Sequence, residues 1–267
     1  NGASSRTAPS ALKKLGVDLT VINDQPNGLN INDHCGSTHM EAIRQLVLDT
    51  GADVGLAFDG DADRLLAVNE LGNLVNGDQI MAICGCYLKS QGKLKKNAIV
   101  ATIMSNLGLF QMGEREGITI PKTKVGDRYV LEKMRAEGYI LGGEQSGHVI
   151  FLDDNTTGDG LLSALHLLEV MVNTGKPLSE LAEIMEVLPQ ALVNAKVPNH
   201  KKEKFMEYQE IADAVADVEK KFKGEGRVLI RPSGTEPLVR VMIEGKDQKV
   251  IDEEARKLAE LITKIML

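Results

Sequence analysis

A regular alternation of short apolar runs and amphipathic stretches across residues 77–172 constrains the fold more than any other feature of this chain. Runs bounded by glycine and polar turns are typical of strands, and apolar residues at a spacing of three or four are typical of helices. The pattern predicts helices at 77–91, 107–115, 129–136 and 159–172, and strands at 98–103, 118–123 and 139–141. Such alternation builds βαβ units, so we expect an α/β fold with parallel or mixed sheets flanked by helices.

The regions on either side of this alternation have their own patterns. On the N-terminal side, residues 8–15 read as a helix, 17–22 as a strand by strict alternation, and 54–58 and 65–68 as two apolar strands. On the C-terminal side, strands at 191–197, 227–230 and 238–243 and two amphipathic helices, the last carrying Ile251, Leu258 and Ile265, predict a separate α+β domain. We therefore expect three domains, at 1–70, 71–188 and 189–267.

Composition and charge exclude some functions. The 267 residues carry a net charge of −7 and no Trp, whereas nucleic-acid binding generally needs a positive surface and stacking aromatics. No apolar run is long enough for a transmembrane helix, and the start, Asn1-Gly2-Ala3, shows neither Met nor a signal peptide. We expect no nucleic-acid or membrane partner, a cytoplasmic location consistent with three unpaired cysteines, and a chain that is a fragment or a processed form.

An acidic loop, Asp59-Gly60-Asp61-Ala62-Asp63-Arg64, joins the two strands at 54–58 and 65–68. Carboxylates this close repel each other unless a cation neutralises them, and hard oxygen ligands suit Mg²⁺ or Ca²⁺. The loop therefore predicts a metal site made by Asp59, Asp61 and Asp63, with Arg64 placed to pair with an anion held on the metal.

Two other metal-loop interpretations stay open at this point. An EF-hand would use the same three aspartates, with Glu70 at its twelfth position, but it needs Gly where Arg64 stands and helices where strands are predicted. A haloacid-dehalogenase-type phosphatase places a similar D-x-D after a strand, but Asp63 stands where Thr or Val is expected.

Two further loops carry polar residues in patterns that suit ligand binding. Gly142-Gly143-Glu144-Gln145-Ser146-Gly147-His148 is glycine-rich. In an extended segment Glu144 and Ser146 would share one face, where they could bind sugar hydroxyls. Arg231-Pro232-Ser233-Gly234-Thr235-Glu236-Pro237, with Arg240 beyond it, combines Arg, hydroxyls and freed backbone N–H groups, which predicts a phosphate-binding loop.

Together the three loops resemble, in order, the metal, sugar and phosphate loops of the α-D-phosphohexomutase family. Three further stretches resemble its phosphoglucosamine branch: Gly28-Leu29-Asn30-Ile31-Asn32, Cys35-Gly36-Ser37-Thr38-His39 and Thr123-Lys124-Val125-Gly126-Asp127-Arg128-Tyr129. The resemblance implies phosphohexomutase-type domains and a cytoplasmic, Mg²⁺-dependent isomerase that interconverts glucosamine 6-phosphate and glucosamine 1-phosphate for cell-wall precursor synthesis. Glucosamine 1,6-bisphosphate would be its intermediate and activator, and a homodimer stays open.

The same resemblance assigns a role to each candidate residue. Asp59, Asp61 and Asp63 would hold Mg²⁺, and Arg64 would neutralise charge on the transferring group. Ring hydroxyls would be held by Glu144 and Ser146, beside His148. The far phosphate would be bound by Arg231, Ser233, Gly234, Thr235 and Arg240, with Lys124 and Arg128 as additional contacts.

One departure from the family pattern limits what these residues could do. The family carries its phosphoryl on a phosphoserine in a Thr-Ala-Ser-His-Asn-Pro-like segment, and no such segment occurs in these 267 residues. We therefore expect the first domain to be missing, the second to be truncated, and this chain alone to be inactive. A phosphomannomutase or phosphoglucomutase of the same superfamily, and a calcium-binding module, remain as alternatives.

Overall fold

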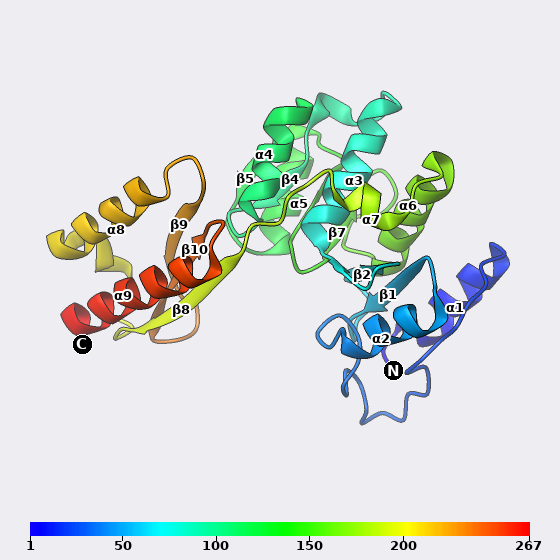
Figure 1. Ribbon diagram of the computed structural model, residues 1–267, viewed down its shortest axis with the longest axis horizontal. Coiled ribbons are helices and arrows are strands. Elements are labelled where there is room, and N and C mark those ends of the chain that lie inside the picture. Colours follow the sequence, from blue (N-terminus) through cyan, green and yellow to red (C-terminus); the bar gives the residue numbers. More distant parts are fainter. The chain divides into compact units, whose positions relative to one another are not determined.

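A computed structural model describes residues 1–267 and divides them into two compact units, Asn1–Glu186 and Val187–Leu267 (Figure 1). No helix combines the length and the apolar character needed to cross a membrane. The expected boundary near residue 70 lies inside the first unit, because the two parts on either side of it share one hydrophobic core. Leu65 and Ala67 belong to the same buried cluster as Met81, Leu109 and Leu167.

The N-terminal part of the first unit contains a small antiparallel sheet with the order β1-β2-β3. Its elements are α1 (Ser4–Lys14), α2 (Glu41–Thr50), β1 (Val54–Phe58), β2 (Leu65–Asn69) and β3 (Leu74–Val75). Phe58 pairs with Leu65 across the β1–β2 hairpin, so the acidic loop is the connection of this hairpin. The two strands therefore fix the loop at both ends.

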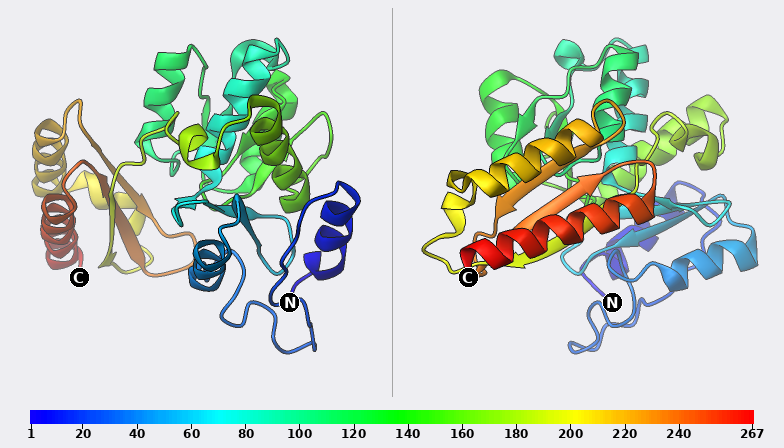
Figure 2. Two further views of the ribbon diagram at one scale, coloured as in Figure 1. Left: turned by 45° about the vertical axis from the view of Figure 1, so that its right-hand side comes forward. Right: turned by 60° about the vertical axis from the view of Figure 1, so that its left-hand side comes forward.

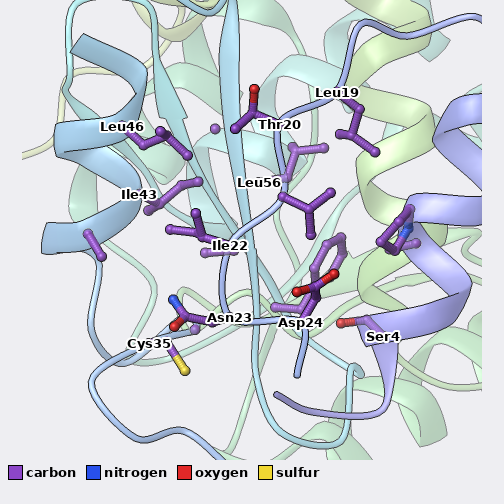
Figure 3. A pocket seen from close by; sticks show the side chains of 18 of the residues that line it. Ser4, Leu19, Thr20, Ile22, Asn23, Asp24, Cys35, Ile43, Leu46 and Leu56 are labelled. Atoms are coloured by element: carbon purple, nitrogen blue, oxygen red, sulfur yellow. The ribbon is translucent and has the colours of Figure 1, made fainter. Parts of the chain in front are cut away.

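The strand expected at 17–22 is wrong: this segment runs extended but pairs with no other strand. None of the backbone amides of residues 18–22 donates a hydrogen bond within the chain. A groove of about 410 Å³ separates the segment from β1, and Leu19 and Ile22 line it opposite Leu56 (Figure 3). Alternating side chains predict an extended backbone, but a strand also needs hydrogen bonds to a neighbouring strand, and this segment makes none.

The larger part of the first unit confirms the predicted α/β class. A four-stranded sheet has the order β5-β4-β6-β7, with β4 parallel to both β5 and β6, and β7 antiparallel to β6. The antiparallel β7 and the short α7 are additions to the predicted alternation. The elements are α3 (Gly77–Ser90), the 3₁₀ turn η1 (Lys95–Asn97), β4 (Val100–Thr102), α4 (Leu107–Glu116), β5 (Lys122–Thr123), α5 (Asp127–Glu137), β6 (Leu141–Gly143), β7 (Val149–Phe151), α6 (Gly160–Thr174) and α7 (Leu178–Ala182).

The second unit is an α+β domain, as predicted. Its antiparallel sheet has the order β8-β10-β9, and α8 and α9 cover one face of it (Figure 2). The elements are β8 (Gln190–Lys196), the 3₁₀ helix η2 (Lys202–Glu207), α8 (Gln209–Lys221), β9 (Arg227–Pro232), β10 (Leu238–Glu244) and α9 (Gln248–Met266). Val239, Val241 and Ile243 of β10 face the helices and are fully buried. The alternate residues of β10 therefore lie on the opposite face of the sheet.

Candidate functional site

The acidic loop has a tight and partly strained backbone. The N–H of Ala62 donates to the carbonyl of Asp59 at 3.2 Å, and Ala62 has a φ of 63°, in the left-handed region that side chains other than glycine rarely adopt. Because β1 and β2 flank the loop, the EF-hand interpretation, which requires flanking helices, is wrong.

Two of the three loop carboxyls lie together. Burial raises the pKa of Asp59, and a hydrogen bond with the neighbouring Asp63 carboxyl raises it further. Asp61 is exposed, and no group of three or more His, Cys, Asp or Glu side chains in this structure is arranged to hold a metal ion. The donors have the chemistry of a hard-cation site, but the structure gathers only Asp59 and Asp63 of the predicted three.

Arg64 lies beside these carboxyls, but its guanidinium forms no close ion pair with either of them. Its backbone N–H donates to Oδ1 of Asp59 at 3.1 Å, and its Nε lies 4.0 Å from Oδ1 of Asp63. Nε is buried and has no hydrogen-bond partner. A buried donor left unsatisfied is unfavourable, so the guanidinium retains the capacity to bind an anion.

The glycine-rich polar loop connects β6 and β7 as a hairpin. The N–H of Gly147 donates to the carbonyl of Glu144 at 3.0 Å, which makes residues 144–147 a turn and not an extended segment. The expectation that Glu144 and Ser146 share a face because they alternate is therefore wrong. Ser146 is exposed, whereas Oε1 of Glu144 accepts a hydrogen bond from the N–H of Gly126 at 3.0 Å.

His148 links the polar loop to the acidic loop. The side chain is buried, and its Nε2 lies 3.5 Å from Oδ2 of Asp63 and 3.8 Å from Oδ2 of Asp127. Its Nδ1 has no hydrogen-bond partner. A Cβ at Gly158 would lie 2.4 Å from Nε2, so glycine is needed there to leave room for the ring. The structure thus brings a predicted sugar residue against a predicted metal residue and adds Asp127, to which the sequence assigned no role.

Backbone contacts hold the two loops together. The N–H of Leu65 donates to the carbonyl of Gly147 at 3.0 Å, and the N–H of Gly160, at the start of α6, donates to the carbonyl of Ala62 at 2.9 Å. Gly147 has a φ of 97°, and a Cβ there would lie 2.2 Å from the Leu65 carbonyl oxygen. Only glycine permits this approach, which explains one of the glycines that the sequence places in the polar loop.

Lys124 and Arg128 lie on either side of Gly126, and both are exposed. The Nε of Arg128 lies 2.7 Å from Oε1 of Glu132, one turn along α5. Neither side chain forms a hydrogen bond or ion pair with the polar loop. The contact of this segment with Glu144 runs through the Gly126 backbone instead.

The second unit places two arginines directly opposite each other. Arg231 of β9 pairs with Arg240 of β10, on the sheet face that the helices leave uncovered. Four residues further along β10, on the same face, Glu244 pairs with Arg227 and forms an ion pair with it. Like charges directly opposite each other in a sheet are destabilising, so the Arg231–Arg240 pair is unfavourable by itself. The Arg227–Glu244 pair is neutralised.

The arginine pair has unused binding capacity. Burial and the neighbouring Arg240 lower the pKa of Arg231, and the buried Nε atoms of both arginines have no hydrogen-bond partner. The only ion pair formed by either arginine joins Arg240 to Oε2 of Glu236, at 2.9 Å. Two adjacent guanidiniums with unpartnered Nε atoms have the charge and donor chemistry that suits a multiply charged anion such as a phosphate.

The loop between β9 and β10 presents its tip to solvent. Gly234 and Thr235 are exposed, and a Cβ at Gly234 would meet nothing within 4 Å. Ser233 is buried, and its Oγ accepts a hydrogen bond from the N–H of Glu236 at 3.2 Å. The Ser233 oxygen therefore supports the turn, and the open side of the loop is formed by Gly234 and Thr235.

Comparison with known families assigns nearly the whole chain. Residues 1–72 match domain II, 76–188 match domain III and 192–261 match the C-terminal domain of phosphoglucomutase/phosphomannomutase. The chain belongs to the phosphoglucomutase/phosphomannomutase family.

Among the curated relatives, the phosphoglucosamine mutase of Acetivibrio thermocellus is 62% identical over 98% of this chain. This chain spans only 58% of the length of that relative.

Solved structures confirm the fold. A phosphoglucomutase/phosphomannomutase family protein from Burkholderia thailandensis has a TM-score of 0.79 at 22% identity, covering 98% of this chain and 59% of its own. The N-acetylphosphoglucosamine mutase of Aspergillus fumigatus, in complex with GlcNAc-6P and magnesium, has a TM-score of 0.72 at 19% identity, covering 99% of this chain and 59% of its own.

Proposed function

We propose that this chain supplies the metal, sugar and phosphate loops of a phosphoglucosamine mutase, which interconverts glucosamine 6-phosphate and glucosamine 1-phosphate. The observation that carries the proposal is the Arg231–Arg240 pair. It keeps two cations directly opposite each other on the sheet face away from α8 and α9, although the Arg227–Glu244 pair shows that the same strands can neutralise a cation. The high identity to phosphoglucosamine mutases supports the choice of an amino sugar.

In this proposal the acidic loop binds Mg²⁺ through Asp59, Asp61 and Asp63. The closeness of Asp59 and Asp63 supports it: burial first, and then the neighbouring Asp63 carboxyl, raise the pKa of Asp59, and a bound cation would favour the ionised form of both groups. The Aspergillus relative was solved with magnesium. Bound Mg²⁺ would supply a Lewis acid that neutralises charge on a phosphoryl group. Arg64, with its free Nε, would bind an oxygen of the same group.

The remaining residues position the sugar phosphate. Glu144 and Ser146 would hold ring hydroxyls, and His148 would keep the polar loop against Asp63. Arg231, Arg240, Thr235 and the backbone at Gly234 would bind the phosphate far from the reacting group, with Ser233 supporting the turn. The exposed side chains of Lys124 and Arg128 would make additional contacts with the sugar phosphate.

We further propose that the phosphoserine lies in a segment outside these 267 residues, and that positions 1–70, 71–188 and 189–267 act as successive domains. Without a phosphoserine, no 1,6-bisphosphate can be formed from the monophosphate, because the protein has no donor from which a phosphoryl group can pass to the second sugar hydroxyl. We therefore expect this chain by itself to bind the sugar phosphate weakly and not to turn it over.

A chimera tests the proposal. The portion of the Acetivibrio thermocellus enzyme that precedes the matched region is fused to this chain and assayed with Mg²⁺, glucosamine 6-phosphate and catalytic glucosamine 1,6-bisphosphate. We expect glucosamine 1-phosphate to form, and Asp61→Asn to abolish its formation while the chimera stays folded. Asp153→Asn, which removes an exposed carboxylate paired with Lys95, is the matched control and should remain active.

Relative kcat/KM on the 6-phosphates of glucosamine, glucose and mannose separates the proposal from its alternative. A preference for glucose or mannose phosphate would assign the chain to a phosphoglucomutase or phosphomannomutase. A folded chimera without activity on any of the three would refute the proposed function.

A further inference from the structure

Lys202 is a buried lysine that the proposed function does not use. It lies at the start of η2, the residue is only 8% exposed, and it forms none of the ion pairs in the chain. Lysine is rarely buried without a partner, because its charge must then be compensated by other polar groups. The partners of Lys202 identify its task.

Both of these partners are backbone carbonyls of the phosphate loop. Nζ donates to the carbonyl of Ser233 and to the carbonyl of Glu236, the latter at 3.3 Å. These two residues are also joined by the hydrogen bond from the N–H of Glu236 to Oγ of Ser233. The ammonium group therefore holds the two ends of the turn that presents Gly234 and Thr235.

The direction of the Ser233 carbonyl fixes the direction of the next amide. In a planar trans peptide the C=O and the following N–H point in opposite directions. With the Ser233 carbonyl directed to Lys202, the N–H of Gly234 points away from Lys202, and it makes no hydrogen bond within the chain. Gly234 is exposed and has open space around it. The carbonyl of Glu236 is followed by Pro237, which has no N–H, so only the Gly234 amide is oriented in this way.

We propose that Lys202 is a positioning residue for phosphate binding: it holds the Ser233 and Glu236 carbonyls so that the Gly234 N–H faces the bound phosphate together with Arg231 and Arg240. This inference rests on the proposed function of the loop as a phosphate site. Lys202 does not contact the phosphate itself. Its positive charge, held beneath the turn, adds to the favourable potential for an anion.

The test compares Lys202→Met with Lys201→Met in the 267-residue chain. Lys201 is a matched control because its Nζ also donates to a backbone carbonyl, that of Met266 at 3.1 Å, which lies outside the loop. Amide resonances are followed by NMR during titration with inorganic phosphate and with glucosamine 6-phosphate. We expect Lys202→Met to weaken both affinities about tenfold, as for the loss of a hydrogen bond to a charged group, and to remove the shift of the Gly234 amide on binding. Lys201→Met should change neither.

The same NMR titration of the unaltered chain also tests the proposal, and it does not depend on whether the variants fold. Its Gly234 amide should be among the resonances that phosphate shifts most, and an unmoved Gly234 amide in a chain that binds phosphate would overturn the positioning role. A folded Lys202→Met variant with unchanged affinity would do the same. If Arg231→Ala weakens binding but Lys202→Met does not, the proposed phosphate loop stands and only the role of Lys202 fails. If the unaltered chain binds neither probe, the phosphate site is refuted and the role of Lys202 falls with it.

Discussion

Two cross-strand pairs on β9 and β10 lie on the same face of the sheet but differ in charge. One joins a cation to an anion, and the other places two cations opposite each other. Arg227 and Glu244 form a neutralised ion pair in which Glu244 is fully buried. Arg231 and Arg240, four residues away on each strand, place two cations together with their Nε atoms unpartnered. The first arrangement neutralises its own charges, whereas in the second only Arg240 has a carboxylate partner, Glu236, and the pair keeps an excess of positive charge. Like charges that a fold keeps in contact therefore point to a ligand of opposite sign.

The first unit repeats this contrast with negative charge. Asp59 and Asp63 lie carboxyl to carboxyl in the acidic loop, and the pKa of Asp59 is raised by burial and by that contact. Glu70, which follows β2, instead accepts two hydrogen bonds from Ser179. The partners of a charged group thus separate a candidate site from a structural contact more reliably than its residue type does.

The largest expected effect is a loss of stability when the Arg227–Glu244 ion pair is broken. Arg227→Met leaves the buried Glu244 carboxylate without its cation, and breaking a buried ion pair in this way costs about 3 kcal/mol. Urea unfolding monitored by circular dichroism should show this loss for the second unit. The double variant Arg227→Met with Glu244→Leu should recover most of it, because an apolar pair of similar volume replaces the charges. Equal loss in the single and double variants would show that packing, and not charge, stabilises this end of the sheet.

For the Arg231–Arg240 pair we expect a loss of phosphate affinity without a loss of stability. Arg240→Met removes one of two repelling cations, so the stability of the second unit should stay the same or rise slightly. Phosphate affinity should fall about ten- to hundredfold, the value of a charge-assisted hydrogen bond. Calorimetric titration with glucosamine 6-phosphate measures the affinity. Destabilisation as large as that of Arg227→Met, with unchanged affinity, would remove the distinction between the two pairs.

The acidic loop should behave in the same way towards a cation. Asp59→Asn keeps an oxygen that can accept the Arg64 N–H but removes one negative charge. We expect the affinity for Mg²⁺ to fall about tenfold or more, because the cation loses a charged ligand, while thermal stability in the absence of Mg²⁺ is unchanged or slightly higher. Calorimetry with Mg²⁺ and thermal unfolding in a chelator measure the two quantities. Asp153→Asn should leave the Mg²⁺ affinity unaltered, and a similar loss in that control would contradict a specific site.

Periodicity and local residue types allowed most of the helices and the positions of the three loops to be predicted, although not the short α7. They did not show which backbones would become neighbours. Residues 17–22 have the alternation of a strand, yet no strand pairs with them in the structure. Glu144 and Ser146 were assigned to one face of an extended segment that is in fact a turn. Lys202 lies 31 residues before Ser233, and Asp127 meets His148 only through the packing of α5 against the polar loop. Such contacts depend on long-range pairing that local patterns do not encode.

The smallest expected effect concerns Glu70 and depends on pH. Burial alone would raise the pKa of Glu70, but the hydrogen bonds from Ser179 outweigh it and hold the pKa below the ordinary value of 4.5. The ionised carboxylate therefore stabilises the fold above about pH 4.5, and this contribution is lost as the pH falls through the lower folded pKa. Glu70→Gln should reduce the free energy of unfolding by about 1 kcal/mol at neutral pH, and the difference should shrink in acid. Because the donors of Ser179 are uncharged, high salt should leave this difference intact. The effect of Glu254→Gln, a carboxylate whose pKa is lowered first by a hydrogen bond from Lys221, should decrease in high salt. Urea unfolding across pH and salt measures both variants, and a salt-sensitive Glu70 would show that a cation, and not Ser179, is its effective partner.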